Sequence, residues 1–233
     1  MMPRTPRPAG SKPAAPRAPR TRGRPTGEAP GLRPRLLDAA LARYASQGIA
    51  ATRLRDIARD AGATPALLHY YFGDGKHLLE AVIEERILPA IMPMRDAVAA
   101  AAAGDDITAA VAAFVNGMSD TIEKHPWVPA LWVREVLSEG GALTSVLIDE
   151  SGRPIVSLMA SRFAAAQARG EVNAALDPRL LELSLVSLTF FPPAAAPLWR
   201  QLLDARGLGK EDVCRHTLEL LQHGFRAEPR NGG

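Results

Sequence analysis

TRLRDIARDAGATPALLHYYF, residues 52–72, has the spacing of two short helices joined by a tight turn. The apolar residues of the first helix recur at the i, i+3, i+4, i+7 spacing of one helical face: Leu54, Ile57, Ala58 and Ala61. Thr52 precedes this face as a favourable N-cap, and Gly62 supplies a left-handed turn at its end. Thr64 followed by Pro65 is a favourable start for the second helix.

The same stretch suits two helices that cross near a right angle. Ala58 is small enough for the two backbones to approach closely, Gly62 allows the turn, and Leu68 anchors the second helix. Four side chains of the second helix remain free to face a major groove: Thr64, Ala66, His69 and Tyr70. The stretch therefore predicts a helix-turn-helix. The alternative is an ordinary helical hairpin in an all-α core, because alanine-rich helices with a glycine turn are common.

A longer signature surrounds this pair of helices. GATPALLHYYFGDGKHLL, residues 62–79, closely resembles the signature of the tetracycline-repressor (TetR) family. Matching positions upstream are Ala40, Tyr44, Gly48, Thr52, Ile57-Ala58 and Ala61-Gly62. The resemblance spans residues 33–82. It implies a homodimeric repressor that leaves a palindromic operator in double-stranded DNA when a small-molecule effector binds.

The resemblance also assigns residues to DNA. Family positions that contact bases and phosphates match Thr64, Ala66, Leu67, His69 and Tyr71, and the lysine that opens helix four grips a phosphate. This chain departs from the pattern twice, because His69 replaces a tyrosine and Gly75 replaces the lysine, with Lys76 one residue later. Histidine can still donate to a phosphate, and a long lysine can reach one. The predicted DNA-binding residues are Arg22, Arg24, Thr52, Thr64, Ala66, Leu67, His69, Tyr70, Tyr71 and Lys76.

Charge is distributed unevenly along the chain. Residues 1–30 carry seven basic residues and one acidic residue, and residues 31–76 carry seven basic and four acidic residues. Residues 77–233 carry fourteen basic and twenty acidic residues. DNA would be attracted to the first part and repelled by the last. The first 30 residues also hold eight of the 20 prolines, which predicts a disordered basic arm. Arg22 and Arg24 flank a glycine as in an AT-hook; the alternative to minor-groove insertion is general attraction to phosphates.

The rest of the chain has helical periodicity without strand alternation, which predicts an all-α, two-domain fold. The predicted helices are 33–47, 53–61, 65–71, 75–99, 106–124, 127–138, 142–169, 178–191 and 209–225. The predicted parts are a basic arm at 1–32, the DNA-binding domain at 33–76, a sensing and dimerisation domain at 77–226 and a disordered tail at 227–233.

Motifs for catalysis or metal binding are missing from the sequence. Cys214 is the single cysteine, and His216 and His223 are seven residues apart without further ligands nearby. No G-x-S-x-G, phosphate-binding glycine loop or H-E-x-x-H motif occurs. The sequence therefore predicts a protein that is not an enzyme and has no catalytic residues, metal or cofactor. The uncharged stretch 183–199 is short and broken by prolines, which favours an interface helix over a membrane span. A single cysteine fits a protein of the reducing cytoplasm.

Large apolar side chains of the second domain could enclose a ligand. The predicted ligand-binding residues are Phe114, Met118, Trp127, Trp132, Arg134, Met159 and Phe163. Flat aromatic walls favour a hydrophobic, ring-containing molecule, and the alternative is that these residues are only core. Arg134 and Glu135 point in different directions, so at most one faces inward. An inward Arg134 would orient an acid; an Arg134 paired at the surface would favour a neutral or cationic ligand.

The function expected from these observations is ligand-responsive repression. A symmetric dimer through residues 183–199 and 209–225 would hold two recognition helices at the spacing of successive major grooves. A ligand that prefers a splayed conformation would lower DNA affinity, with helix four as the lever. Two alternatives stay open: an all-α enzyme with an incidental hairpin, and an architectural protein that binds DNA without regard to sequence.

Overall fold

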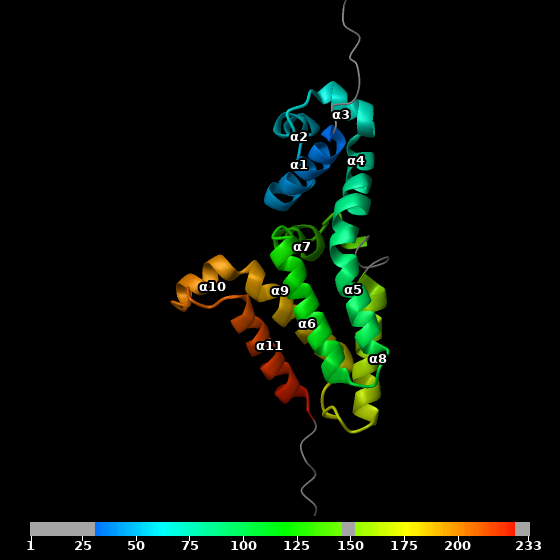
Figure 1. Ribbon diagram of the computed structural model, residues 1–233, viewed down its shortest axis with the longest axis vertical. Coiled ribbons are helices and arrows are strands. Elements are labelled where there is room, and N and C mark those ends of the chain that lie inside the picture. The colour runs from blue at the N-terminus through cyan, green and yellow to red at the C-terminus, as the bar shows by residue number, and fades with distance from the viewer. Residues whose placement is uncertain (1–30, 146–151, 227–233) are drawn as a thin grey trace, which may run out of the picture. The chain divides into compact units, whose positions relative to one another are not determined.

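A computed structural model describes residues 31–145 and 152–226 (Figure 1). The helices are α1 (Leu32–Gln47), α2 (Leu54–Asp60), α3 (Pro65–Phe72), α4 (Gly75–Val82), η1 (Ile83–Ile87), α5 (Leu88–Ala102), α6 (Ile107–Lys124), α7 (Val128–Trp132), η2 (Val133–Leu137), α8 (Arg153–Ala168), α9 (Pro178–Ala194), α10 (Ala196–Leu202) and α11 (Lys210–Phe225). Within the described ranges there is no β-strand, only one bridge between Val172 and Arg226. The prediction of an all-α fold is confirmed.

Helices α1–α4 and η1, together with Leu131 of α7, Val136 of η2 and Leu143, enclose the first hydrophobic core, which we call the head core. Among its fully buried side chains are Leu36, Leu37, Ala40, Ile57, Ala58, Leu68, Leu78 and Val82. Leu78 and Val82 of α4 belong to this core although they lie beyond the predicted domain end at residue 76. Tyr44 is buried with them, and burial raises the pKa of its hydroxyl to about 12.

Helices α5, α6, α8, α9 and α11 enclose the second core, the body core. Val98, Val111, Met159, Phe163, Leu185 and Phe225 are among its most deeply buried members. Figure 1 shows α5 and α6 running side by side, with α8 beside α5. Three half-buried side chains, Ile91, Trp127 and Trp132, pack against both cores, so the two cores share a boundary made of large apolar groups.

The predicted helix 75–99 is present, but it is made of three segments. A five-residue π-helical segment, η1, joins α4 to α5 just before Pro89. Proline has no amide hydrogen, so the regular α-helical hydrogen bond is missing at that residue. π-Segments and prolines are the usual places where a helical ladder is interrupted. The predicted helix 127–138 is similarly divided into α7 and η2.

Two predicted helices differ from the structure at their ends. The helix predicted at 142–169 starts with a turn at residues 142 and 143, residues 144 and 145 are helical, and α8 begins at Arg153, followed by Pro154 at a favourable position; residues 146–151 lie outside the described residues. At the other end, α9 continues through Pro192 and Pro193 to Ala194, and α10 was not predicted. No single helix in the described ranges is long and apolar enough to cross a bilayer; α9 and α10, bent by 78°, meet that test only as a pair.

Candidate nucleic-acid interface and ligand site

The outer face of α3 is exposed while its inner face is fixed in the head core. The Thr64 hydroxyl accepts a hydrogen bond from the Leu67 amide at 3.3 Å, which caps the helix as predicted. Leu68 is fully buried and Phe72 nearly so. The predicted contact residues Thr64, Ala66, Leu67, His69 and Tyr70 are all exposed. Tyr70 is 76% exposed, an unusual position for a large aromatic ring without a partner surface.

The turn before α3 has the close packing that the sequence predicts. Ala58 is fully buried, and its carbonyl accepts the Ala63 amide at 2.8 Å. Gly62 has φ +66°, and a Cβ added there would lie 2.8 Å from Arg35 Nη2. Glycine therefore relieves backbone strain at this position, and any larger residue would also require the Arg35 side chain to shift.

Two of the predicted contact residues have specific partners within the helix. His69 Nδ1 lies 2.6 Å from the Gly73 carbonyl, which requires a hydrogen on that nitrogen. Nε2 is then an acceptor in the neutral ring and a donor only in the protonated ring. Tyr71 is half-buried and makes an edge contact with Tyr70, with ring centroids 5.6 Å apart.

Lys76 lies in the first turn of α4, where the chain re-emerges beside α3. Its side chain is 81% exposed and 3.8 Å from Glu80, a weak surface pair that leaves the ammonium accessible. Asp74 caps α4 by accepting the His77 amide at 3.0 Å. That hydrogen bond, followed by one from the His77 ring, lowers the pKa of Asp74.

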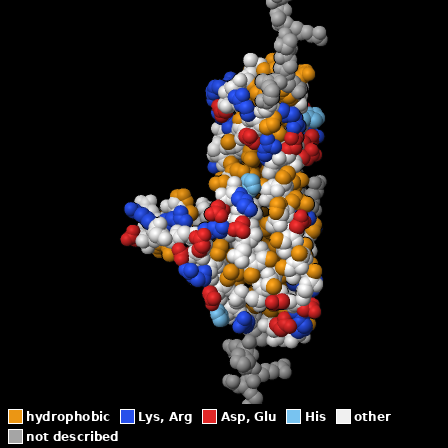
Figure 2. All heavy atoms as spheres, in the orientation of Figure 1, with side chains coloured by type: hydrophobic (Ala, Val, Ile, Leu, Met, Phe, Trp, Pro, Cys, Tyr) orange, Lys and Arg blue, Asp and Glu red, His pale blue; other side chains and the backbone are white. Residues whose placement is uncertain are grey.

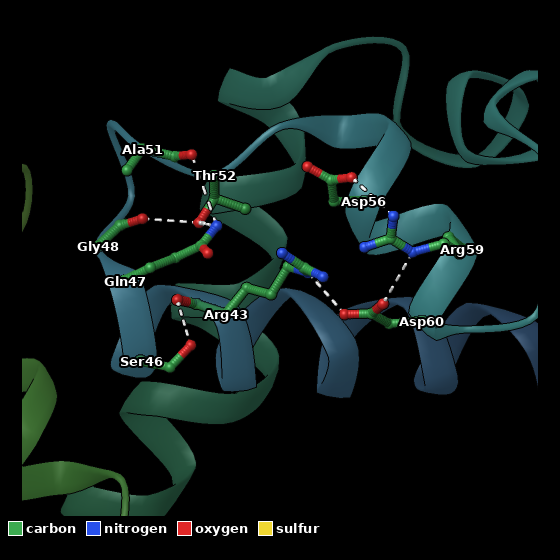
Figure 3. A network of polar contacts seen from close by, with 9 residues as sticks. All are labelled: Arg43, Ser46, Gln47, Gly48, Ala51, Thr52, Asp56, Arg59 and Asp60. Atoms are coloured by element: carbon green, nitrogen blue, oxygen red, sulfur yellow. Dashed lines mark hydrogen bonds and ion pairs between the residues drawn. The ribbon is translucent and has the colours of Figure 1, made fainter.

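Thr52 does not cap α2. The residue at the N-cap is Arg53, and the Thr52 hydroxyl instead donates to the Gly48 carbonyl at 2.6 Å (Figure 3). Gln47 Nε2 donates to the same hydroxyl at 3.2 Å. The chain enters α2 one residue later than predicted, because the Thr52 side chain folds back over the loop after α1.

Ion pairs fasten α1 to α2 behind this loop. Arg43 Nε donates to Asp60 at 2.6 Å, and Arg59 lies between Asp56 at 3.4 Å and Asp60 at 3.6 Å (Figure 3). The hydrogen bond from Arg43 is the main cause of the lowered pKa of Asp60. These arginines and aspartates neutralise one another within the head.

Two cations of the head were missed by the sequence analysis. Arg53 and Arg55, at the start of α2, are exposed and have no ion pair within the described part of the chain. In the sequence, only their position distinguishes these two arginines from the other basic residues. Basic residues are common at a helix-turn-helix, and only the structure shows which of them form ion pairs. Figure 2 shows basic side chains gathered over the α1–α4 end, with acidic ones beside them. Arg22 and Arg24 lie outside the described residues.

The predicted ligand residues fall into separate places. Phe114, Met118 and Trp132 line a cavity of about 80 Å³ among α5, α6, α7, α8 and α9, and Trp132 stacks on Phe190 with ring centroids 4.7 Å apart. Met159 and Phe163 are buried within the body core and do not reach this cavity. Trp127 lines a shallow hollow against α1 instead.

Of the neighbouring residues Arg134 and Glu135, it is Glu135 that is buried, so Arg134 does not face inward toward a ligand. Arg134 is exposed, and Glu135 is only 5% exposed. The Glu135 carboxylate accepts the Ile49 amide at 2.8 Å and the Ala142 amide at 3.2 Å. Glu135 therefore joins η2 to the loop that follows α1.

Glycine at position 48 makes room for this contact. Gly48 has φ +91°, and a Cβ added there would lie 3.0 Å from Glu135 Oε1. A side chain at this position would therefore be strained and would press on the carboxylate.

A second, larger cavity lies among α6, α9, α10 and α11. It has a volume of about 340 Å³, and Trp199, Arg200 and Lys210 are among its lining residues. Hydrogen bonds from Lys210 to Asp120 at 2.6 Å and Glu123 at 2.7 Å raise the pKa of that lysine. This cavity could not be predicted from the sequence because its walls come from distant segments. No cluster of three His, Cys, Asp or Glu side chains suited to a metal occurs within residues 31–145 and 152–226.

Comparison with known proteins agrees with this architecture. The HTH-type transcriptional regulator BetI of Rhizobium meliloti (strain 1021) is 47% identical over 57 residues, 24% of this chain and 28% of BetI. The ketosteroid transcriptional regulator KstR2 of Mycobacterium tuberculosis aligns over 88% of this chain and 100% of its own at 17% identity, with a TM-score of 0.63. The fatty acid degradation regulator FadR from Bacillus halodurans aligns over 87% and 100% at 15% identity, with a TM-score of 0.59. KstR2 and FadR show a shared fold.

Two family descriptions match the chain itself. Residues 36–82 match "Bacterial regulatory proteins, tetR family", and residues 108–221 match "Tetracyclin repressor-like, C-terminal domain". Together these ranges cover more than half of the chain, from the helix-turn-helix to α11. The chain therefore belongs to the tetR family of bacterial transcriptional regulators.

Proposed function

We propose that this protein is a cytoplasmic, homodimeric repressor that leaves a palindromic operator when a small apolar molecule enters its body core. Regulators of this family bind DNA, dimerise and respond to small-molecule effectors. The observation that carries the proposal is the position of Trp132. It lines the 80 Å³ cavity and also packs against the head core, so one side chain touches both the ligand site and the DNA-binding end.

The proposed DNA contacts divide into two kinds. Thr64, Ala66, Leu67, His69 and Tyr70 present the exposed face of α3 and are proposed to contact base edges and nearby backbone in the major groove. Arg53, Arg55 and Lys76 are exposed cations on the flanking helix ends and are proposed to bind phosphates. Thr52 and Tyr71 are proposed to support this surface.

The proposed dimer interface lies on α9, α10 and α11. Large apolar side chains are exposed there: Leu180, Leu183, Phe191, Leu198, Leu202, Leu203, Leu208 and Leu220. Contiguous exposed apolar residues in this number mark an interaction surface rather than ordinary surface variation. A second copy of the chain suits a symmetric operator, because a two-fold axis in the protein matches the one in the DNA.

The proposed signal reaches the helix-turn-helix through two connections. One is the Glu135–Ile49 hydrogen bond, and the other is the continuous segment α4–η1–α5. Arg33 donates to Glu85 at 2.6 Å and Arg86 donates to Asp38 at 2.6 Å, so η1 is tied to α1. A ligand that parts Trp132 from Phe190 would move η2 and the loop at Ile49 together. The ligand would lower DNA affinity only to the extent that it binds this altered conformation more tightly than the DNA-binding one.

The proposal is tested by selecting bound fragments from bacterial genomic DNA with the purified full-length protein and sequencing them. Enrichment of one palindromic sequence, retained at physiological salt, supports a regulator that reads a specific operator. Uniform recovery of fragments with a steep salt dependence would instead indicate architectural DNA binding.

A further inference from the structure

Glu182 is a buried carboxylate without a partner. It lies on α9, is 3% exposed, and neither of its oxygens has a hydrogen-bond partner within the described ranges. Buried polar side chains are nearly always hydrogen-bonded, because burying one without a partner costs free energy. An unsatisfied carboxylate at this position therefore calls for a partner that the described residues do not supply.

The position of Glu182 relates it to the aromatic cavity. Glu182, Val186 and Phe190 are spaced i, i+4, i+8 and so form one stripe of α9, and Val186 and Phe190 both line the 80 Å³ cavity. At a rise of about 1.5 Å per residue, Glu182 is about 6 Å along the helix from Val186 and about 12 Å from Phe190. The carboxylate thus lies one turn beyond the cavity wall on the side away from the stacked rings.

We propose that the effector is a lipophilic amine, whose apolar ring separates Trp132 from Phe190 and whose ammonium group binds the Glu182 carboxylate. The inference rests on the proposed function and adds the chemical class of its ligand. An ammonium group supplies both the hydrogen-bond donors and the opposite charge that a buried carboxylate lacks. A neutral alcohol supplies one donor and no charge, and a carboxylate ligand supplies no donor and would oppose the ionisation of Glu182.

The protonation of Glu182 gives this binding event a distinct signature. Burial raises the pKa of the Glu182 carboxyl to about 8, so it is mostly protonated near pH 7 in the free protein. A bound ammonium favours the ionised form, and the displaced proton passes to the buffer. Arg95 also lines the cavity, half-buried beside Met92, and is the group that an acidic ligand would contact.

The test uses three probes with one carbon skeleton: 4-phenylbutylamine, 4-phenylbutan-1-ol and 4-phenylbutanoate. Binding to the full-length protein is measured by calorimetry at pH 7 in buffers of different ionisation enthalpy. The expected result is that the amine binds at least ten-fold more tightly than either other probe and releases about one proton. In Glu182→Gln, which keeps the side-chain shape, the amine should lose at least ten-fold in affinity and release no proton, while the alcohol binds as before.

Glu139→Gln, at an exposed glutamate on the loop after η2, is the matched control and should bind all three probes like the unmodified protein. Tighter binding of the acid, unchanged amine binding in Glu182→Gln, or binding of none of the probes would overturn the inference. DNA release is scored separately on the selected operator. Glu182-dependent amine binding that leaves operator affinity unchanged would support the amine site and contradict the proposed effector response.

Discussion

Tyr70 and His69 show how much depends on single side chains at the proposed DNA surface. Both are exposed on α3, while the adjacent Leu68 is fully buried and holds the helix in place. The helix can therefore lose its outer side chains without losing its anchor. Substitutions on the outer face of α3 should therefore change DNA affinity, and substitutions on its inner face should change the stability of the fold.

Replacing His69 and Tyr70 by alanine should weaken binding to the selected operator by about 1–3 kcal/mol for each base-specific hydrogen bond that the substitution removes. The melting temperature should stay nearly constant, since neither side chain is buried. Fluorescence anisotropy with operator and random DNA measures both affinities. Lys76→Ala is the contrasting variant and should weaken the two DNAs alike, lowering the salt slope by about one. Unchanged operator affinity in the double variant would remove α3 from the interface.

Glu182 makes a prediction for stability against pH. Its carboxyl has a pKa of about 8 in the folded protein and about 4.5 when unfolded, so the unfolded state loses its proton first as pH rises. Stability should therefore fall between about pH 4.5 and 8, by an amount on the order of 4 kcal/mol. Urea unfolding across this range should show a weaker decline in Glu182→Gln than in the unmodified protein. If the free energy of unfolding declined equally with pH in the two proteins, Glu182 would not be held in a desolvated site.

At the scale of elements, the helix-turn-helix could be predicted from sequence because its signals are local. The spacing of Ala58, Gly62 and Leu68 specifies two short helices and a turn within a few residues. α10 could not be predicted in this way, since Pro192, Pro193 and Pro197 usually interrupt helices. The structure tolerates them at the α9–α10 junction, where Trp199 Nε1 donates to the Pro192 carbonyl at 2.7 Å.

The candidate ligand site was harder to predict than the head. Phe114, Met118 and Trp132 were identified from residue type, but Phe190 and Glu182 of α9 were not. A helical pattern shows which residues share a face of one helix. It does not show which face of another helix they meet, and that long-range pairing separates a cavity wall from a core residue.

The hydrogen bond between Glu135 of η2 and Ile49 of the α1–α2 loop should hold the helix-turn-helix in position. In Glu135→Ala, the Ile49 and Ala142 amides no longer have their acceptor, at a cost of about 1–3 kcal/mol for each hydrogen bond to this carboxylate. Hydrogen exchange at the Ile49 amide should accelerate, and operator affinity should change although α3 is untouched. Glu139→Ala, at an exposed position, should leave both quantities as they were. Slow exchange at Ile49 in Glu135→Ala would show that η2 does not restrain the head.

At the scale of the whole molecule, charge and apolar surface are separated. Residues 1–76 carry fourteen basic and five acidic residues, and residues 77–233 carry fourteen and twenty. The exposed leucines and Phe191 lie on α9–α11, away from the helix-turn-helix in sequence and outside the head core. Such a molecule has one end suited to a polyanion and another surface suited to a copy of itself.

Phe191→Glu should therefore give a monomer. The side chain is 67% exposed in the single chain, so the charge is tolerated by the fold but not in an apolar interface. Light scattering at micromolar concentration measures the mass, and operator binding should weaken because one head reads only a few base pairs. Leu137→Glu is the matched control: its side chain is 66% exposed on η2, and it should remain dimeric. A dimeric Phe191→Glu variant with full affinity would place the interface elsewhere.

Hydroxyl-radical footprinting of the selected operator tests the central claim that a symmetric pair of α3 helices reads the DNA. Two protected half-sites are expected on one face of the duplex, with centres about one helical turn or a simple multiple of a turn apart. Protection of both half-sites should disappear together in the His69/Tyr70 double variant. Protection spread evenly along the fragment, or a single half-site that survives the double variant, would contradict the account.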